Sequence, residues 1–382
     1  MGHAAQQPSQ AVGRLLRRRR KELQLTLQDV SRTLGAKGQL IPISTLARIE
    51  RGELDPGVPR LHQLLRLYGI RPHLVTDLMD MEALAVEPPA TKDIKTLFND
   101  GLKYWEQGNT AQGLAHLFAV REYVPDDEAS RVIRQKATFV FAGFARTLGK
   151  FELAHQLLDD LLREPPDSTI LFNVLLLSAD VWRGLGSLPA AFAFQHQAEV
   201  AADPASSRQR SWATHQKGRL LTAAKRPDEA ESALHLAISA YRELGDSSGE
   251  TKAMLALSEA LTAAERHTEA RETATRALER SEAMGHALLA LSARTKIGLG
   301  LVASGEFENG VATLTDALSR AMLLKDHHGQ FLAHYHLWKV FKATGEVERA
   351  NLALESARYF VRFVDEASSE ADEIRSIPDN GG

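Results

Sequence analysis

Cysteine is absent from this sequence of 382 residues, and its absence excludes several kinds of site. Without a thiol the chain has no disulfide framework, no thiolate nucleophile and no cysteine-ligated zinc. The sequence also has no apolar run of about 20 residues, which a membrane-spanning helix needs. Its first ten residues, MGHAAQQPSQ, do not have the pattern of a signal peptide. We therefore expect a cytoplasmic protein that does not contact a membrane.

Motifs of common enzymes are missing as well. The sequence contains neither Gly-x-Ser-x-Gly nor His-Glu-x-x-His. Residues 143–150, GFARTLGK, come near a phosphate-binding loop, but they have one residue too many and no following serine or threonine. In the cluster His327, His328, His334 and His336, the last two stand two apart and point to different faces of a helix. We expect no enzymatic activity, no cofactor and no metal.

Hydrophobic residues make up 44% of the chain and charged residues 25%, as in ordinary soluble globular proteins. The length suggests two or three domains. The net charge of −3 conceals an asymmetry: residues 1–80 hold 13 Lys and Arg against 7 Asp and Glu, and the remainder holds 33 against 42. A basic N-terminal module on an acidic body indicates nucleic-acid binding, although chance asymmetry is the alternative.

Five short amphipathic helices are expected within residues 11–85, after a disordered tail at residues 1–10. The first covers residues 11–23, the second 27–34 and the fifth 72–84. Thr26 and Asp29 have the spacing of a capping box, and the glycines that follow the second and fourth helices, Gly35 and Gly69, end them. Residues 86–92 form a linker, since a pair of prolines cannot continue a helix.

The first helix carries a basic run, Arg17 to Lys21. In DNA-binding domains built from short helices, a first helix often crosses the DNA backbone, so this run could contact phosphates. A solvated helix face explains the same residues equally well.

The run Ser44–Gly52, STLARIERG, resembles the recognition helix and exit turn of Xre/Cro-type helix-turn-helix regulators. Leu46 and Ile49 point into the core, Glu50 pairs with an arginine of the first helix, and Gly52 supplies a left-handed residue. This sequence departs from the family in its turn: eight residues separate Gly35 from Ser44, where about three are usual. Pro42 is expected at the first helical position.

The resemblance implies that the exposed side chains of the second and third helices bind double-stranded DNA. Arginine can pair with guanine through two hydrogen bonds, and serine or threonine can bond to base edges. Arg48 could instead anchor a phosphate without reading sequence. The residues expected at DNA are Gln28, Lys37, Gln39, Ile43, Ser44, Thr45 and Arg48.

From Asp93 onward the sequence repeats. Small residues recur at intervals of 37 to 41 residues, at Gly113, Ala154, Ala191, Ala230, Ala270, Gly310 and Ala350. Five residues before each is a turn position: Gly108, Gly149, Gly186, Lys225, Glu265, Gly305 and Gly345. Seven residues after each is a further apolar position: Val120, Leu161, Ala198, Ala237, Ala277, Ala317 and Ala357. A fixed period of this size predicts a solenoid of helical hairpins that pack closely where the side chains are small.

Segments such as GEFENG at residues 305–310 and GEVERA at 345–350 resemble the tetratricopeptide repeat (TPR) family. The resemblance covers about residues 95–364, as seven repeats. The expected fold is therefore all-α: a five-helix helix-turn-helix domain, then a right-handed α-solenoid of about seven TPR-like hairpins at residues 93–364. The acidic tail, residues 365–382, is expected to be solvated or frayed.

TPR arrays present a concave groove lined by the first helix of each repeat. An asparagine there can bond to a peptide backbone through both groups of its amide, and arginines suit carboxylates. Any one of these side chains could instead make a contact within the array. The residues expected at a ligand are Lys136, Arg146, Asn173, Asp180, Arg183, Trp212, His215, Gln216, Arg219 and Tyr335, and Lys296, His336 and Lys339 are expected to face the same groove.

An Xre-type head on a TPR body resembles the peptide-pheromone-responsive regulators of the Rgg and PlcR kind. That resemblance implies a homodimeric quorum-sensing transcription regulator whose groove binds a short signalling peptide. The alternative is a TPR interaction scaffold that only dimerises or docks a protein partner and whose head does not read DNA. A steep salt dependence of DNA binding distinguishes the two, because phosphate contacts release counterions.

Overall fold

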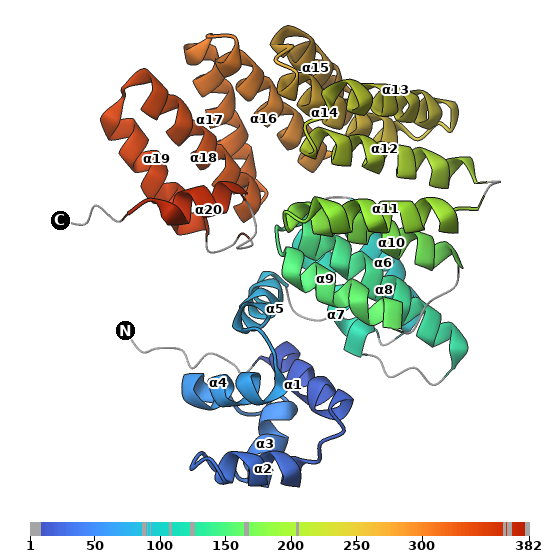
Figure 1. The fold of residues 1–382 in the computed structure, drawn as a ribbon, viewed down its shortest axis with the longest axis vertical. Coiled ribbons are helices and arrows are strands. Elements are labelled where there is room, and N and C mark those ends of the chain that lie inside the picture. The colour runs from blue at the N-terminus through green and yellow to red at the C-terminus, as the bar shows by residue number, and fades with distance from the viewer. Residues whose placement is uncertain are drawn as a thin grey trace.

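The structure is a computed structural model that describes residues 9–85, 89, 91, 93–106, 109–122, 127–163, 168–203, 206–361, 364 and 369–378. Across these residues the helices are the only regular elements, and no strand occurs. Five helices form an N-terminal head, and the remaining fifteen described helices form a curved array above it (Figure 1). The fold is all-α, as predicted.

The head's helices have the predicted order and nearly the predicted bounds. They are α1 (Gln10–Glu22), α2 (Leu27–Gly35), α3 (Ile43–Glu50), α4 (Gly57–Tyr68) and α5 (Pro72–Leu84). The capping box is confirmed: the Thr26 hydroxyl accepts from the Asp29 backbone nitrogen at 3.1 Å, and the Asp29 carboxylate accepts from the Thr26 nitrogen at 2.9 Å. Gly69 ends α4 in the left-handed conformation, as expected. Helix α1 starts and ends one residue earlier than predicted.

The lengthened turn between α2 and α3 is anchored rather than open. Ile41 is buried in the core of the head, and the Ser31 hydroxyl donates to its carbonyl oxygen at 2.7 Å. Pro42 is the N-cap of α3, one residue before the predicted position. A buried side chain in the middle of the turn therefore fixes where the recognition helix begins.

Two contacts hold α1 against α3. The Arg20 guanidinium donates two hydrogen bonds to the Glu50 carboxylate, at 2.7 and 2.8 Å, which confirms that Glu50 pairs with an arginine of the first helix. Gly13 allows the backbones to approach: a Cβ there would lie 2.6 Å from the Ile49 carbonyl oxygen. Gly52 leaves α3 with φ +67°, the left-handed conformation expected of it.

The array consists of seven consecutive helical hairpins and a final short helix. The hairpins are α6 (Ile94–Glu106) with α7 (Thr110–Glu122), α8 (Glu128–Thr147) with α9 (Phe151–Arg163), α10 (Ser168–Gly184) with α11 (Leu188–Ala201), α12 (Ser207–Ala223) with α13 (Pro227–Glu243), α14 (Ser247–Ala263) with α15 (His267–Ala283), α16 (Ala287–Ala303) with α17 (Phe307–Leu323), and α18 (His327–Thr344) with α19 (Val347–Phe360); α20 is Ser369–Ser376.

The predicted period is the period of the hairpins. All seven recurring small residues are buried, and so are the seven positions seven residues later. Six of the seven turn positions have φ between +57° and +82°, and the seventh, Gly108, lies outside the described residues. Lys225 and Glu265 adopt this left-handed conformation without being glycine. The close helix approach therefore follows from side-chain size, as the repeat pattern predicts.

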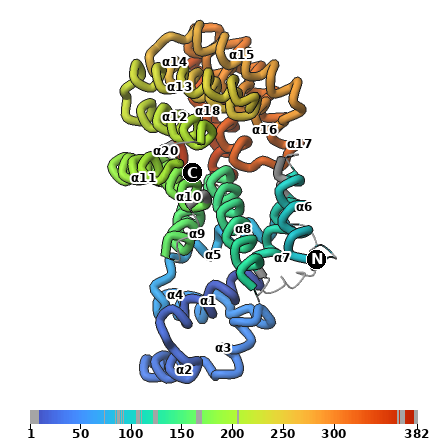
Figure 2. Tube along the Cα trace, turned by 90° about the vertical axis from the view of Figure 1, so that its right-hand side faces the viewer, coloured from blue at the N-terminus to red at the C-terminus, as the bar shows by residue number. Residues whose placement is uncertain are grey.

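The array curves back on itself. First helices of successive hairpins pack side by side from α8 to α18 and form its inner face. At Gly149, between α8 and α9, a Cβ would lie 3.2 Å from His328 at the start of α18 and 3.5 Å from Val364. In Figure 2 the hairpins from α12 to α15 lie at the top, α8 and α9 lie below them, and the head lies at the bottom. The last hairpin therefore closes against the second one.

Residues 369–378 were expected in a solvated tail, and that expectation is wrong for them. Helix α20 buries Ala371 and Ile374 against the last hairpin. The Tyr335 hydroxyl donates to the Glu373 carboxylate at 2.6 Å. An apolar pair spaced by three, Ala371 and Ile374, gives this acidic segment a buried face. The predicted tail at residues 1–8, most of the linker at 86–92, and residues 365–368 and 379–382 lie outside the described residues.

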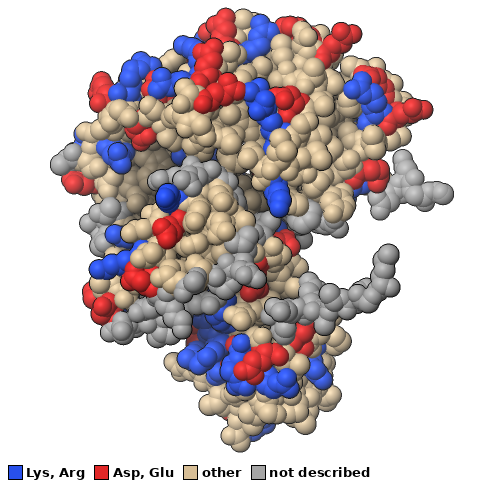
Figure 3. Space-filling view, turned by 180° about the vertical axis from the view of Figure 1, so that it is seen from behind, with Lys and Arg blue, Asp and Glu red and all other residues tan. Residues whose placement is uncertain are grey.

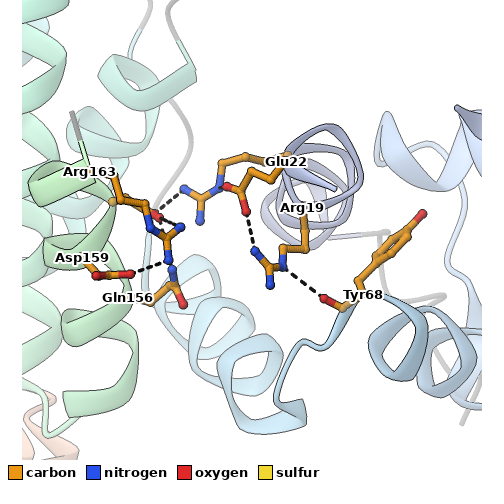
Figure 4. A network of polar contacts seen from close by, with 8 residues as sticks. Arg19, Glu22, Tyr68, Gln156, Asp159 and Arg163 are labelled. Atoms are coloured by element: carbon orange, nitrogen blue, oxygen red, sulfur yellow. Dashed lines mark hydrogen bonds and ion pairs between the residues drawn. The ribbon is translucent and has the colours of Figure 1, made fainter. Parts of the chain in front are cut away.

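The head rests on the first two hairpins of the array. Lys150 of the α8–α9 turn is buried and donates to Asp77 and Asp80 of α5, at 2.9 Å each. The Arg18 guanidinium of α1 lies 2.7 Å from Asp160 of α9. Figure 4 shows this meeting of α1 and α9, with Arg163, Asp159 and Gln156 of α9 facing the helix that carries Arg19 and Glu22. One continuous apolar core joins the head to the hairpins from α6 to α10.

Candidate DNA interface and ligand groove

The candidate DNA interface is the outer face of α3 with the N-terminus of α2. Leu46 and Ile49 are buried, as predicted, and this orientation of α3 exposes Ser44 and Arg48 and half-exposes Thr45. Gln28 is exposed in the first turn of α2. The predicted residues lie on α2, on α3 and in the turn between them: Gln28, Lys37, Gln39, Ile43, Ser44, Thr45 and Arg48.

The turn adds apolar side chains to this face. Leu40 is 67% exposed and Ile43 is 47% exposed, although both are large and hydrophobic. An apolar side chain in a major groove can contact the thymine methyl group.

A small basic pocket adjoins the turn. It has a volume of about 240 Å³ and lies between the turn and α4, with Lys37, Gln39, His62 and Arg66 in its lining. No acidic side chain lines it. The lengthened turn therefore adds the positive charge of Lys37 beside Arg66 of α4.

The basic run of α1 serves the fold. Arg20 binds Glu50, and Arg19 donates to the Tyr68 carbonyl oxygen at 3.1 Å. Arg18 reaches Asp160 in the array. Figure 3 shows Lys and Arg side chains gathered on the head where it meets the array, with few at its tip. Three of the five residues of the run are therefore occupied by contacts within the fold, whereas Arg17 and Lys21 are exposed.

Inside the array, three arginines from three helices converge on one carboxylate. Arg146 of α8, Arg183 of α10 and Arg219 of α12 lie 3.0, 2.9 and 2.8 Å from the oxygens of Asp180. Asp180 is buried, whereas the arginine side chains are 32%, 22% and 22% exposed. Glu259 is a second carboxylate close to this cluster, because Lys296, Arg183 and Arg219 together lower its pKa to about 2.

The pKa values of the cluster reflect this crowding. Burial alone would raise the pKa of Asp180, but the three guanidiniums, Arg219 foremost, hold it well below its ordinary value. Burial lowers the pKa of Arg219 to about 10, opposed by Asp180 and reinforced by the other two arginines. The carboxylate is thus ionised at neutral pH, and it keeps the guanidiniums in place.

The remaining predicted groove residues divide into two groups. Lys136 and Asn173 have side chains that make no hydrogen bond within the described part of the chain, and both are at least partly exposed. Others are occupied: Trp212 packs edge-on against Phe172, and Tyr335 bonds to Glu373. The last three are buried: Asp180 at the centre of the cluster, and His215 and Gln216 around it. The Gln216 side chain accepts a hydrogen bond from Arg219 at 2.8 Å.

Sequence reasoning missed Lys252 of α14, which is exposed. Burial lowers the pKa of its ammonium and Arg146 lowers it further, whereas Asp246 opposes the shift. The position of Lys252 within its repeat could have identified it as a groove residue. Lys252 stands thirteen residues before its turn residue, like Lys136 and Asn173 before theirs.

A further hollow lies away from the groove. A hollow of about 710 Å³ between α11, α12 and α13 is lined by both signs of charge, including Glu199, Arg210 and Asp228. No group of three or more His, Asp and Glu side chains that could hold a metal ion occurs in the ranges the structure describes. Among the same residues, no helix has the length and apolarity to cross a membrane.

Residues 11–78 match the family model of a helix-turn-helix domain. Among solved structures, a Rap protein complexed with competence and sporulation factor has a TM-score of 0.59 and 11% identity, over 74% of this chain and 80% of that chain. PlcR of Bacillus thuringiensis, in complex with the peptide PapR7 and DNA, has a TM-score of 0.48 and 12% identity, over 85% and 99%. A comparison with curated proteins found no significant similarity. The chain therefore joins a helix-turn-helix domain to a TPR-like helical array.

Proposed function

We propose that this chain is a sequence-specific DNA-binding transcriptional regulator that acts as a homodimer and is controlled by a short signalling peptide in the groove of its array. The observation that carries the DNA part is the exposed face of α3 within a helix-turn-helix domain. Dimerisation is proposed because such heads commonly read paired half-sites.

The groove supports the ligand part. Asn173 offers an amide that can both donate to and accept from a peptide backbone. The three arginines around Asp180 are partly exposed and can donate hydrogen bonds to a peptide carboxylate. The Rap protein whose fold the array shares was crystallised with competence and sporulation factor. A bound effector in this chain is our proposal.

A direct path joins the groove to the head. Arg146 lies in the last turn of α8, four residues before Lys150, and Lys150 holds the Asp77 and Asp80 carboxylates of α5. An effector that binds Arg146 and displaces it therefore acts on the α8–α9 turn, which binds the head. It changes DNA binding only if it binds two arrangements of this junction with unequal affinity.

The test is a titration of the purified protein on DNA from its own upstream region, at fixed salt, with and without a peptide fraction from the producing culture. A change of affinity with the fraction supports an effector-controlled regulator. Tight binding without a change supports a DNA reader whose array only dimerises or docks a protein. No specific binding supports the scaffold alternative.

Arg48→Ala tests the recognition face. We expect specific binding to weaken by about 1–3 kcal/mol, because a bidentate contact to a base is lost, with unchanged helix content by circular dichroism. Arg208→Ala, which removes an exposed arginine from α12, is the matched control. Equal affinities of the two variants for the operator would exclude Arg48 from the interface.

Asn173→Ala tests the effector part separately. This variant should bind DNA as the parent does and respond less to the peptide fraction. A full response would remove Asn173 from the ligand site.

A further inference from the structure

The pocket between the α2–α3 turn and α4 collects side chains that can donate hydrogen bonds. Lys37 and Gln39 come from the turn, and His62, Gln63 and Arg66 come from α4. We name this site the turn pocket. None of these five side chains makes a hydrogen bond or an ion pair with another described residue. The turn pocket therefore offers several unused donors to one ligand.

Acidic residues are missing from both walls of the turn pocket. No Asp or Glu occurs in residues 30–49, which include the turn, or in residues 56–76, which include most of α4. Lys37 and Arg66 each carry a full positive charge, so the walls suit an anion. The acids that border these two segments are engaged elsewhere: Asp29 with Thr26, Glu50 with Arg20, Asp55 with the Gly57 nitrogen, and Asp77 with Lys150.

The backbone of the turn pocket is fixed. Gly38 adopts the left-handed conformation at φ +71°, and the backbone nitrogens of residues 37–39 donate to carbonyl oxygens of the last two residues of α2, at 2.9 to 3.0 Å. The burial of Ile41 holds the other end of the turn. On the opposite wall, His62 and Arg66 stand four residues apart and share one face of α4. The pocket is therefore formed before a ligand enters it.

The turn pocket also adjoins the recognition helix, because Gln39 stands four residues before Ile43, where α3 begins. We propose that the turn pocket is a phosphate-binding site that holds a backbone phosphate of DNA beside the face of α3. The inference rests on the DNA-binding part of the proposed function. A phosphate group accepts several charge-assisted hydrogen bonds at once. Such a contact positions the protein on the duplex and reads no sequence.

The test is a titration of the full chain on its upstream DNA and on an unrelated duplex of equal length, at several salt concentrations. Arg66→Gln should weaken binding to both duplexes about tenfold and reduce the slope of log K against log salt by about one, because one phosphate contact is lost. Arg66→Lys keeps the charge and should keep the slope. Arg208→Gln, which removes an exposed arginine from α12, should behave as the parent does.

The ratio of the two affinities separates this site from the recognition face. Arg66→Gln should leave the ratio unchanged, because it removes a contact to phosphate, whereas Arg48→Ala should lower it. A changed ratio with an unchanged salt slope in Arg66→Gln would indicate a base contact and would overturn the phosphate site.

Inorganic phosphate distinguishes a DNA phosphate from a small phosphate compound. Its binding is measured by calorimetry at constant ionic strength, with the parent, Arg66→Gln and Arg208→Gln. Phosphate binding that only Arg66→Gln abolishes, with DNA affinity unchanged, supports the site and assigns it to a small phosphate compound. A reduced salt slope without binding of inorganic phosphate assigns it to DNA. The absence of both effects would overturn the site.

The same titrations separate this inference from the proposed function. Specific DNA binding by the parent that Arg66→Gln leaves unchanged in affinity and salt slope, without phosphate binding, supports the DNA reader and overturns the turn pocket. If the parent binds neither duplex, the DNA-binding part of the proposed function fails. Calorimetry with inorganic phosphate then decides the turn pocket alone.

Discussion

Arg20 and Glu50 show how a single pair can fix a domain. They are thirty residues apart in the chain, and the carboxylate accepts two hydrogen bonds from the guanidinium in the core of the head. Donation to Glu50 is the main reason that the pKa of Arg20 is raised. Glu50 is the last residue of α3, and the pair is largely buried. The pair therefore positions α3 without facing DNA.

Glu50→Ala should lower the free energy of unfolding of the head by about 3–5 kcal/mol, because it leaves a buried guanidinium without its carboxylate. Urea denaturation followed by circular dichroism measures this change. Glu53→Ala is the matched control, since Glu53 binds Arg51 in a similar geometry on the surface. We expect no measurable change from it. Equal effects of the two substitutions would show that the buried pair does not hold α3.

At the scale of elements, the positions of glycine and alanine determine how closely two helices can pack. The alanines and glycines that recur every 37 to 41 residues are all buried between the helices of a hairpin. Gly13 performs the same role in the head, where α1 meets the end of α3. Because a Cβ at Gly13 would meet backbone atoms of Ile49, Glu50 and Gly52, an added methyl group cannot be accommodated by moving a flexible side chain.

Gly13→Ala should therefore destabilise the head by about 1–3 kcal/mol, despite the better helix propensity of alanine. Gly143→Ala in α8 is the control, because a Cβ at Gly143 would meet nothing within 4 Å. It should stabilise the array by up to about 1 kcal/mol. Thermal unfolding of both variants tests the difference in sign. A stabilising Gly13→Ala would refute the close approach of α1 and α3.

At the scale of the whole molecule, the turn between α8 and α9 is a junction. Gly149 contacts His328 and Val364 at the end of the array, and Lys150 binds Asp77 and Asp80 in the head. Burial alone would lower the pKa of Lys150, but the two carboxylates raise it. A group with a raised pKa stabilises the fold fully at neutral pH, and Lys150 loses this contribution only above its ordinary value of 10.5.

Lys150→Gln should reduce the effector-induced change in DNA affinity about tenfold while leaving the recognition face intact. The physical reason is that the ammonium is the link from the α8–α9 turn to α5. Arg226→Gln, the equivalent position one residue after the Lys225 turn, pairs only with its neighbour Glu229 and serves as control. A normal effector response in the Lys150 variant would place the coupling elsewhere.

Acid should weaken the array through His215. Burial, with the nearby cation Arg219, lowers the pKa of His215 to about 3, and Asp180 opposes this shift; Lys252 and Arg146 add to it. The unfolded chain takes up a proton near pH 6.5 and the folded chain does not. The contribution of His215 to the free energy of unfolding is therefore complete above pH 6.5, and it falls by about 1.4 kcal/mol per pH unit toward pH 3. His215→Gln should fall less steeply in urea titrations from pH 7 to pH 4, whereas the exposed His196→Gln should follow the parent.

The sequence by itself determined the local structure. Thr26 and Asp29 cap α2 from three residues apart, and the small residues and turn positions of the array recur at a period visible in one chain. Helix caps, helix faces and left-handed turns depend on neighbours within about one or two helical turns, so their causes lie in adjacent residues. The face of α3 that presents Ser44 and Arg48 follows from the burial of Leu46 and Ile49 for the same reason.

Only the tertiary structure decided which charges meet. The sequence suggested that Arg146, Arg183 and Arg219 face one groove, but their shared contact with Asp180 depends on how three hairpins stack. The burial of α20 and the contact of Gly149 with His328 depend on the curvature accumulated over five hairpins. The sequence left Arg18, Arg19 and Arg20 of α1 available to phosphates, but in the structure they bind residues of the array and the head. Ion pairs join residues far apart in the chain, and no local pattern specifies the distance that the folded backbone leaves between them.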